Sequence, residues 1–317
     1  MAAADVFAKG FGDCKALSFY MKALLKEVGI ESNYAVISTD KANVMADFAN
    51  VTEFNHAILQ VPLEADTLWL ECTNPTLPFG FVHDDIAGHQ TLLVKPQGGE
   101  MVRVRDYDDD LKVDTIDVDV TIAADYSAQL RVRHKSMLDG YSFAEKLGKL
   151  EAKKQELALK ALLKQSNVVL SDIDLRVDKS EVPSGEVIFT ASQQLYGKKS
   201  GTRLFAPINL NTPGYANYTL NSRKTDISVP ASGIVYRTVL HLAEGMTVES
   251  LVKPSVTECE FGKVEEKCEQ SADGSTIAIT QIVHINRGRY PADRNADFKT
   301  FRDVIKRLYT QNIVIKK

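Results

Sequence analysis

Cysteine is scarce in this chain of 317 residues, which contains only four. Cys14 and Cys72 stand alone in the sequence, while Cys259 and Cys268 lie nine positions apart. Four thiols are too few for a disulfide-stabilised scaffold, and their spacing fits no zinc-binding motif. We therefore expect a fold stabilised by a hydrophobic core, with no structural metal.

Long apolar runs and excess positive charge are also missing. No run approaches the roughly 20 apolar residues that span a bilayer. The formal net charge is −4, with a pI near 5.9, so the chain lacks the broad basic surface typical of nucleic-acid-binding proteins. We expect no membrane-spanning segment, no nucleic-acid partner and no cofactor.

The N-terminus lacks the basic and apolar regions of a signal peptide. Only thirteen residues precede Cys14, so we expect this chain to be the C-terminal part of a longer protein. Any targeting signal would then lie in the missing part.

The composition, with 44% hydrophobic and 25% charged residues, is that of a globular protein of about two domains. Pro96-Gln97-Gly98-Gly99 is typical of a linker. We therefore divide the chain into a first domain of residues 1–96 and a second of residues 97–317.

A glycine-led turn, Gly12-Asp13-Cys14-Lys15, precedes an amphipathic pattern that ends at Gly29, a position typical of a left-handed helix cap. Cys14 therefore falls in the first helical turn, where free N–H groups and the helix dipole favour the nucleophilic thiolate. The alternative is a structural cysteine, because free cysteine is usually a small buried hydrophobe.

Four strands are predicted next, with the second and third joined as a hairpin. They are Asn33–Ser38, Phe54–Val61, Asp66–Thr73 and Thr91–Lys95. A four-residue loop over 62–65 pairs His56 with Glu71, and such a carboxylate holds an imidazole in one tautomer as a general base requires. A slip of one residue would instead place Cys72 opposite His56. Alternatively, both residues are ordinary strand positions.

The loop Asn74–Gly88 and the residue after it contain four possible metal ligands, His83, Asp84, Asp85 and His89. Their spacing matches no recognised ligand pattern. We expect a solvated loop there.

Three motifs in order, Gly12 to Lys15, Phe54-Asn55-His56-Ala57 and Trp69-Leu70-Glu71, resemble the transglutaminase-like branch of the papain-like cysteine superfamily. The resemblance implies a helix packed on an antiparallel sheet, with Cys14 as nucleophile, His56 as base and Glu71 as orienting acid. Two departures stand out: the acid is usually aspartate, and almost none of the helical part that precedes the nucleophile in the family is present.

Beyond residue 97 the pattern predicts a β-sandwich-like domain with one long helix, Tyr141–Gln165, a C-terminal helix, Asp293–Tyr309, and a last strand, Asn312–Lys316. This part resembles the β-rich domain of large bacterial transglutaminase-like proteins, most clearly over Gly288–Ala292. The fold class expected for the whole chain is thus α+β, with a partial papain/transglutaminase-like core followed by the β-rich domain.

Cys259 and Cys268 leave two alternatives open. A two-residue turn at Lys263-Val264 would pair the two cysteines across a hairpin and suit a disulfide, which indicates an oxidising compartment. Otherwise they are two unpaired thiols.

Two functions follow from these patterns. The first is cysteine-dependent acyl transfer on protein or peptide amides through Cys14, His56 and Glu71, with hydrolysis favoured over transamidation. The second is a non-catalytic, cell-envelope module that binds protein or glycan on a degenerate scaffold. A periplasmic or cell-surface location accompanies either, and the sequence names neither substrate nor oligomeric state.

Overall fold

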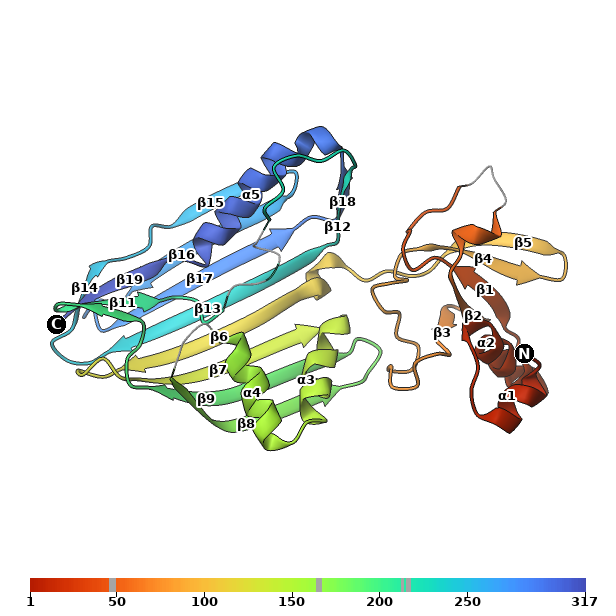
Figure 1. Cartoon of the computed structure of the whole chain (residues 1–317), viewed down its shortest axis with the longest axis horizontal. Helices are drawn as coiled ribbons and strands as arrows, with labels where there is room; N and C mark the ends of the chain where they lie inside the picture. Colours follow the sequence, from red (N-terminus) through yellow and green to blue (C-terminus); the bar gives the residue numbers. More distant parts are fainter. Residues whose placement is uncertain (46–49, 164–166, 212–213, 215–217) are drawn as a thin grey trace. The chain divides into compact units, whose positions relative to one another are not determined.

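The computed structural model describes the chain except for residues 46–49, 164–166, 212–213 and 215–217 (Figure 1). It forms two compact units: Met1–Asp108 with Asp178–Pro183, and Asp109–Val177 with Ser184–Lys317. The division follows Asp108 rather than Pro96, because the expected linker is the turn of a hairpin. This hairpin pairs β4 (Gln90–Lys95) with β5 (Gly98–Arg103).

The first unit is a helix packed on an antiparallel sheet, as predicted. Its five strands follow the order β3-β2-β1-β4-β5. The remaining elements are α1 (Ala3–Lys9), α2 (Cys14–Glu27), β1 (Asn33–Ile37), a 3₁₀ turn (Val51–Glu53), β2 (His56–Pro62) and β3 (Thr67–Leu70). Alternation along β2 sends Ala57 and Leu59 to the face of α2, and Ile58 to the opposite face under the loop that follows β3.

Helix α2 begins at Cys14, as the sequence predicts. The Asp13 side chain caps it by accepting a hydrogen bond from the Ala16 N–H at 2.8 Å. At the other end Gly29 has φ +77°, and the N–H groups of Gly29 and Ile30 bond back to the carbonyls of Lys26 and Leu25. These paired bonds form a Schellman motif, so glycine satisfies the last carbonyls of the helix.

The β2–β3 hairpin differs in register from the prediction. Val61 pairs with Leu68 instead of Asp66, because the loop begins one residue later, after Pro62, and ends at Asp66. The pairing is displaced by two positions, which preserves side-chain alternation. His56 and Glu71 therefore still share a face, although they are no longer directly opposite each other.

The second unit is built on an eight-stranded sheet of order β15-β16-β17-β13-β6-β7-β9-β8. Its strands are β6 (Val113–Ile122), β7 (Ala128–Met137), β8 (Val168–Asp178), β9 (Ser184–Gln193), β13 (Ser232–Leu242), β15 (Ser255–Cys259), β16 (Gly262–Gln270) and β17 (Thr276–Ile285). Strand β6 runs parallel to β13, whereas the pairs β13–β17, β15–β16, β16–β17, β6–β7 and β7–β9 are antiparallel. The β-rich domain expected from the sequence is therefore present.

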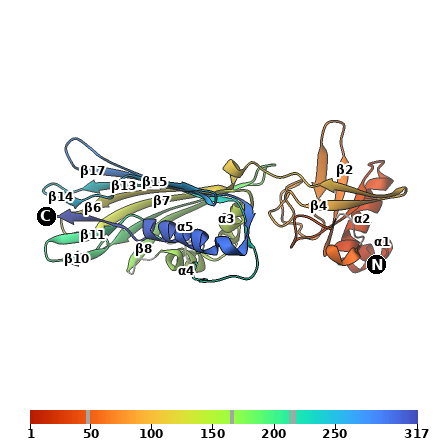
Figure 2. The same cartoon turned by 90° about the horizontal axis from the view of Figure 1, so that it is seen from above.

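A second layer covers one face of this sheet (Figure 2). It contains α3 (Tyr141–Gly148), α4 (Ala152–Leu162), α5 (Asn295–Leu308) and a small sheet of β10 (Lys198–Ser200), β11 (Arg203–Pro207), β19 (Asn312–Lys316) and β14 (Thr247–Ser250). A two-stranded pair, β12 (Ile227–Val229) and β18 (Gly288–Tyr290), and the 3₁₀ turns Asp109–Lys112, Leu138–Gly140 and Ala292–Arg294 complete the unit. One continuous apolar core joins the two layers.

The single long helix predicted over Tyr141–Gln165 is wrong. Helix α3 ends at Gly148, a poor helix former, and α4 restarts at Ala152. The break lets both helices place leucines in the core, Leu147 from α3 and Leu159 from α4. The expected end at Gln165 lies outside the described residues.

Of the two alternatives left open for Cys259 and Cys268, the structure shows the unpaired thiols. Cys259 pairs with Gly262 across a tight turn, and all four cysteines are free thiols. The turn falls at Glu260-Phe261 because Gly262 has φ +146° and lies so close to the His284 carbonyl that a Cβ would clash with it. Because the two cysteines form no disulfide, they give no support for an oxidising compartment.

None of the helices within the described ranges combines the length and the apolar character that a membrane crossing requires.

Candidate functional site

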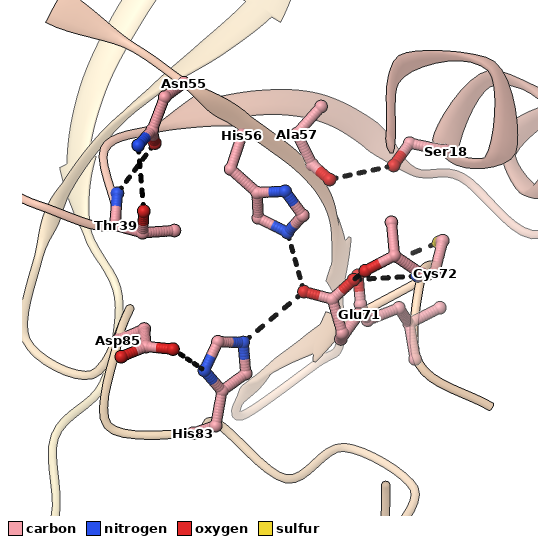
Figure 3. Close-up of polar contacts among 11 residues, drawn as sticks. Ser18, Thr39, Asn55, His56, Ala57, Glu71, Cys72, His83 and Asp85 are labelled. Atoms are coloured by element: carbon pink, nitrogen blue, oxygen red, sulfur yellow. Dashed lines mark hydrogen bonds and ion pairs between the residues drawn. The ribbon is translucent and has the colours of Figure 1, made fainter. Parts of the chain in front are cut away.

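Glu71 is the centre of a polar cluster in the first unit (Figure 3). It follows the last residue of β3, and its Oε2 lies 2.7 Å from His56 Nε2. Its other oxygen, Oε1, accepts hydrogen bonds from the Thr73 N–H at 2.8 Å and from the Thr73 hydroxyl at 2.5 Å. The Glu71 side chain is only 5% exposed, so these contacts fix the carboxylate in one position.

The electrostatics of Glu71 reflect these contacts. Burial alone would raise the pKa of the Glu71 carboxyl. Hydrogen bonds from His56, His83 and Thr73 outweigh that effect and hold the pKa well below its usual range. Glu71 is therefore a buried carboxylate at neutral pH, facing the ring of His56.

His56 is held by its neighbours as well as by Glu71. The preceding residue, Asn55, accepts a hydrogen bond from the Thr39 N–H at 2.9 Å and donates to the Thr39 hydroxyl and to Asp40. With Nε2–H donated to Glu71, the other ring nitrogen, Nδ1, carries the lone pair. Nδ1 makes no hydrogen bond with any residue whose position the structure describes. It is therefore the nitrogen able to accept a proton.

Cys14 occupies the start of α2 and packs with Tyr34, Ala57 and Leu59, on the face of the sheet that α2 covers. His56 pairs with Ile37, whose side chain belongs to the cluster on the opposite face. In the described part of the chain, no hydrogen bond joins the Cys14 thiol to His56. The structure thus brings His56 and Glu71 together and leaves Cys14 unbonded to both.

Cys72 is the second thiol near α2. Burial raises its pKa to about 11, with a smaller contribution from the nearby Glu71 charge, while a hydrogen bond with Ser18 acts in the opposite direction. Ser18 also donates to the Ala57 carbonyl at 3.1 Å. A thiol with so high a pKa is protonated at neutral pH, and Cys72 packs against the cluster formed by Tyr34, Ala57 and Leu59.

His83 is the member of this cluster that the sequence analysis missed. The loop was expected to be solvated, but the His83 side chain is 16% exposed, and its Nε2 lies 3.4 Å from Glu71 Oε2. The apolar residues Val82, Ile86 and Ala87 beside it are buried, and they were the available signal that this loop packs down. Within the described residues, no group of His, Cys, Asp and Glu has the geometry to hold a metal ion.

Comparisons with known proteins concern the fold. A domain family of unknown function, DUF3858, matches residues 201–315, which lie in the second unit. A solved structure described as a "putative protease", from Parabacteroides distasonis, matches 99% of this chain with a TM-score of 0.53 and 11% sequence identity. The chain spans 46% of that protein. Among curated proteins, none matches this sequence.

Proposed function

We propose that the first unit carries a cysteine-dependent acyl-transfer centre of the peptidase type, with Cys14 as nucleophile, His56 as base and Glu71 as orienting acid. The observation that carries this proposal is the buried contact of 2.7 Å between His56 and Glu71. An oriented imidazole with one occupied and one available nitrogen is the arrangement that a thiol nucleophile needs. The three motifs that resemble the transglutaminase-like core add support.

In the proposed reaction, His56 Nδ1 takes the proton of the Cys14 thiol, and the thiolate attacks the carbonyl carbon of a peptide amide. A C–S bond forms, and the C–N bond breaks as His56 gives its proton to the leaving amine. Water, deprotonated by His56, then cleaves the thioester and restores the thiol. Glu71 remains ionised throughout and stabilises the imidazolium. An amine in place of water would make the reaction a transamidation.

This chemistry requires the Cys14 sulfur to meet Nδ1 at the end of β2. Cys14 is the first residue of its helix and His56 is the first residue of its strand. The proposal therefore requires the thiol, which packs on the face covered by α2, to reach the imidazole around the first residue of β2.

A second candidate is a non-catalytic scaffold, whose β-rich unit binds protein or glycan. One observation favours it, namely the packing of Cys14 with Ala57 and Leu59 and the missing hydrogen bond to His56 among the residues described. In that case the His56–Glu71 contact stabilises the fold and has no chemical role.

Acylation by p-nitrophenyl acetate separates the two candidates without knowledge of the natural substrate. We expect a burst of nitrophenolate and an acetyl thioester on Cys14, found by mass spectrometry of the peptide that contains it. The exposed thiol Cys259 is an internal reference in the same sample. Acetylation of Cys14 no faster than that of Cys259, or unchanged in His56→Ala, would favour the non-catalytic scaffold.

A further inference from the structure

We propose that His83 is a positioning residue for this centre, acting on His56 through Glu71. The inference rests on the function proposed above and adds a residue that none of the three motifs contains. His83 comes from the loop after β3, yet it contacts the same carboxylate oxygen as His56 (Figure 3).

Both carboxylate oxygens of Glu71 accept hydrogen bonds. Oε1 is occupied by the two donors of Thr73, while Oε2 receives His56 at 2.7 Å and His83 at 3.4 Å. A carboxylate oxygen has two lone pairs, so it can accept from both rings at once. The carboxylate is therefore held from three directions, and its shorter contact is the one to His56. Removing His83 would free one side of Oε2 and let the carboxylate rotate away from His56.

His83 is itself held in place by the backbone around it. Val82, which precedes it, and Ile86, three positions after it, are 1% and 2% exposed. The His83 carbonyl accepts hydrogen bonds of 3.0 Å from the N–H groups of Ile86 and Ala87. A side chain on so well anchored a turn can fix its partner, as a positioning residue must.

Asp85 is a further charged neighbour of His83, and it provides a matched control. Its Oδ2 lies 3.7 Å from His83 Nδ1, but its side chain is 76% exposed. An ion pair of this kind contributes little. Asp85→Asn should therefore leave the His56–Glu71 contact unchanged. Loss of the His83 contact with Glu71 should disturb it.

The test compares His83→Leu, which removes the donor, with His83→Gln, whose amide replaces the Nε2–H. The first measurement is the ¹⁵N spectrum of the His56 ring above about pH 8, where an ordinary histidine is neutral. Wild type, Asp85→Asn and His83→Gln should show the Nε2–H tautomer, and His83→Leu a mixture of both. The second is the acetylation rate of Cys14, which should fall about tenfold in His83→Leu and be restored in His83→Gln.

The proposal is overturned if folded His83→Leu retains the wild-type His56 spectrum, or if His83→Gln shows the mixture. Should His83→Leu fail to fold, His83→Phe, which keeps a flat ring but has no N–H donor, takes its place in the same comparison. The two proposals fail differently. If wild-type Cys14 acetylates no faster than Cys259, the proposed function fails, while the His56 spectrum still tests the role of His83.

Discussion

At the scale of single residues, Glu71 determines what the first unit can do. The carboxylate is buried and ionised because three hydrogen-bonding neighbours outweigh the cost of desolvation. The glutamate side chain reaches His56 from just beyond β3, across a register displaced by two positions.

The depressed pKa of Glu71 predicts how stability depends on pH. The folded pKa lies below the unfolded value of 4.5, so the unfolded state binds the proton first as pH falls. Stability from this group is present above about pH 5 and is lost as pH falls through the lowered folded pKa. Urea unfolding followed by Trp69, the only tryptophan, measures the first unit directly. Glu71→Gln should lower the free energy of unfolding by about 2 kcal/mol near neutral pH. It should also make the loss of stability at acid pH less steep. If Glu71→Gln loses stability at acid pH as steeply as the wild type does, Glu71 is not the group responsible.

Cys72 should be unreactive in the folded protein. With a pKa raised to about 11 from an ordinary 9.0, its thiolate fraction at neutral pH is about 100-fold smaller than that of an ordinary thiol. Iodoacetamide should therefore leave Cys72 unmodified near neutral pH and modify it after denaturation. Peptide mapping checks both states, and rapid labelling of Cys72 in the folded chain would show that this thiol is not buried as described.

At the scale of elements, the sequence predicted the parts that follow from short-range physics. The start of α2 at Cys14, its end at Gly29 and the terminal strand all agree with the structure, because capping and alternation are local signals. Loop ends were placed less well. The hairpin containing Cys259 failed because its turn is set by a close approach of Gly262 to the neighbouring strand, a contact distant in sequence.

The candidate site shows the same limit. His56 and Glu71 were predicted as partners from a four-residue loop, and they remain in contact because the actual two-residue displacement of the hairpin preserves their common face. The contact of His83 depends on how a loop without regular spacing folds back on the sheet, and no periodic signal predicts that. The Cys14 side chain could not be placed either, since the order of motifs says nothing of which face of β2 it meets.

The left-handed end of α2 gives a prediction at this scale. Gly29 has φ +77° and open space around its Cβ position, so a substitution there changes backbone strain without a steric clash. Gly29→Ala should lower the free energy of unfolding by about 1–2 kcal/mol, while Gly29→Asn should cost clearly less, because asparagine tolerates this conformation. Equal losses in the two variants, measured by urea unfolding, would argue against the cap.

At the scale of the whole molecule, the two units carry buried acids of opposite character. Glu266 in the second unit is 2% exposed, and burial raises its pKa, although hydrogen bonds with Gln281 and Gln311 and the charge of Arg307 lower it in part. A raised folded pKa means that the folded state binds the proton more tightly. Stability from Glu266 is therefore present at acid pH and lost as pH rises through the folded value.

Acidification should consequently separate the unfolding of the two units. As pH falls below about 5, the Trp69 transition should move to lower urea relative to the far-UV circular dichroism transition, to which the strands of the second unit contribute most. Glu266→Gln should remove the loss of stability of the second unit at higher pH. Transitions that coincide at every pH would show that the units unfold together, and they would contradict this prediction.

The most direct test of the central claim, that His56 and Glu71 serve Cys14, is the alkylation of Cys14 by iodoacetamide near neutral pH, read by peptide mass spectrometry. Cys259 is the reference because it is the exposed thiol. We predict that Cys14 reacts faster than Cys259, and that His56→Ala slows Cys14 at least about tenfold while leaving Cys259 unchanged. Cys14 reacting no faster than Cys259, or indifferent to the loss of His56, would contradict the claim.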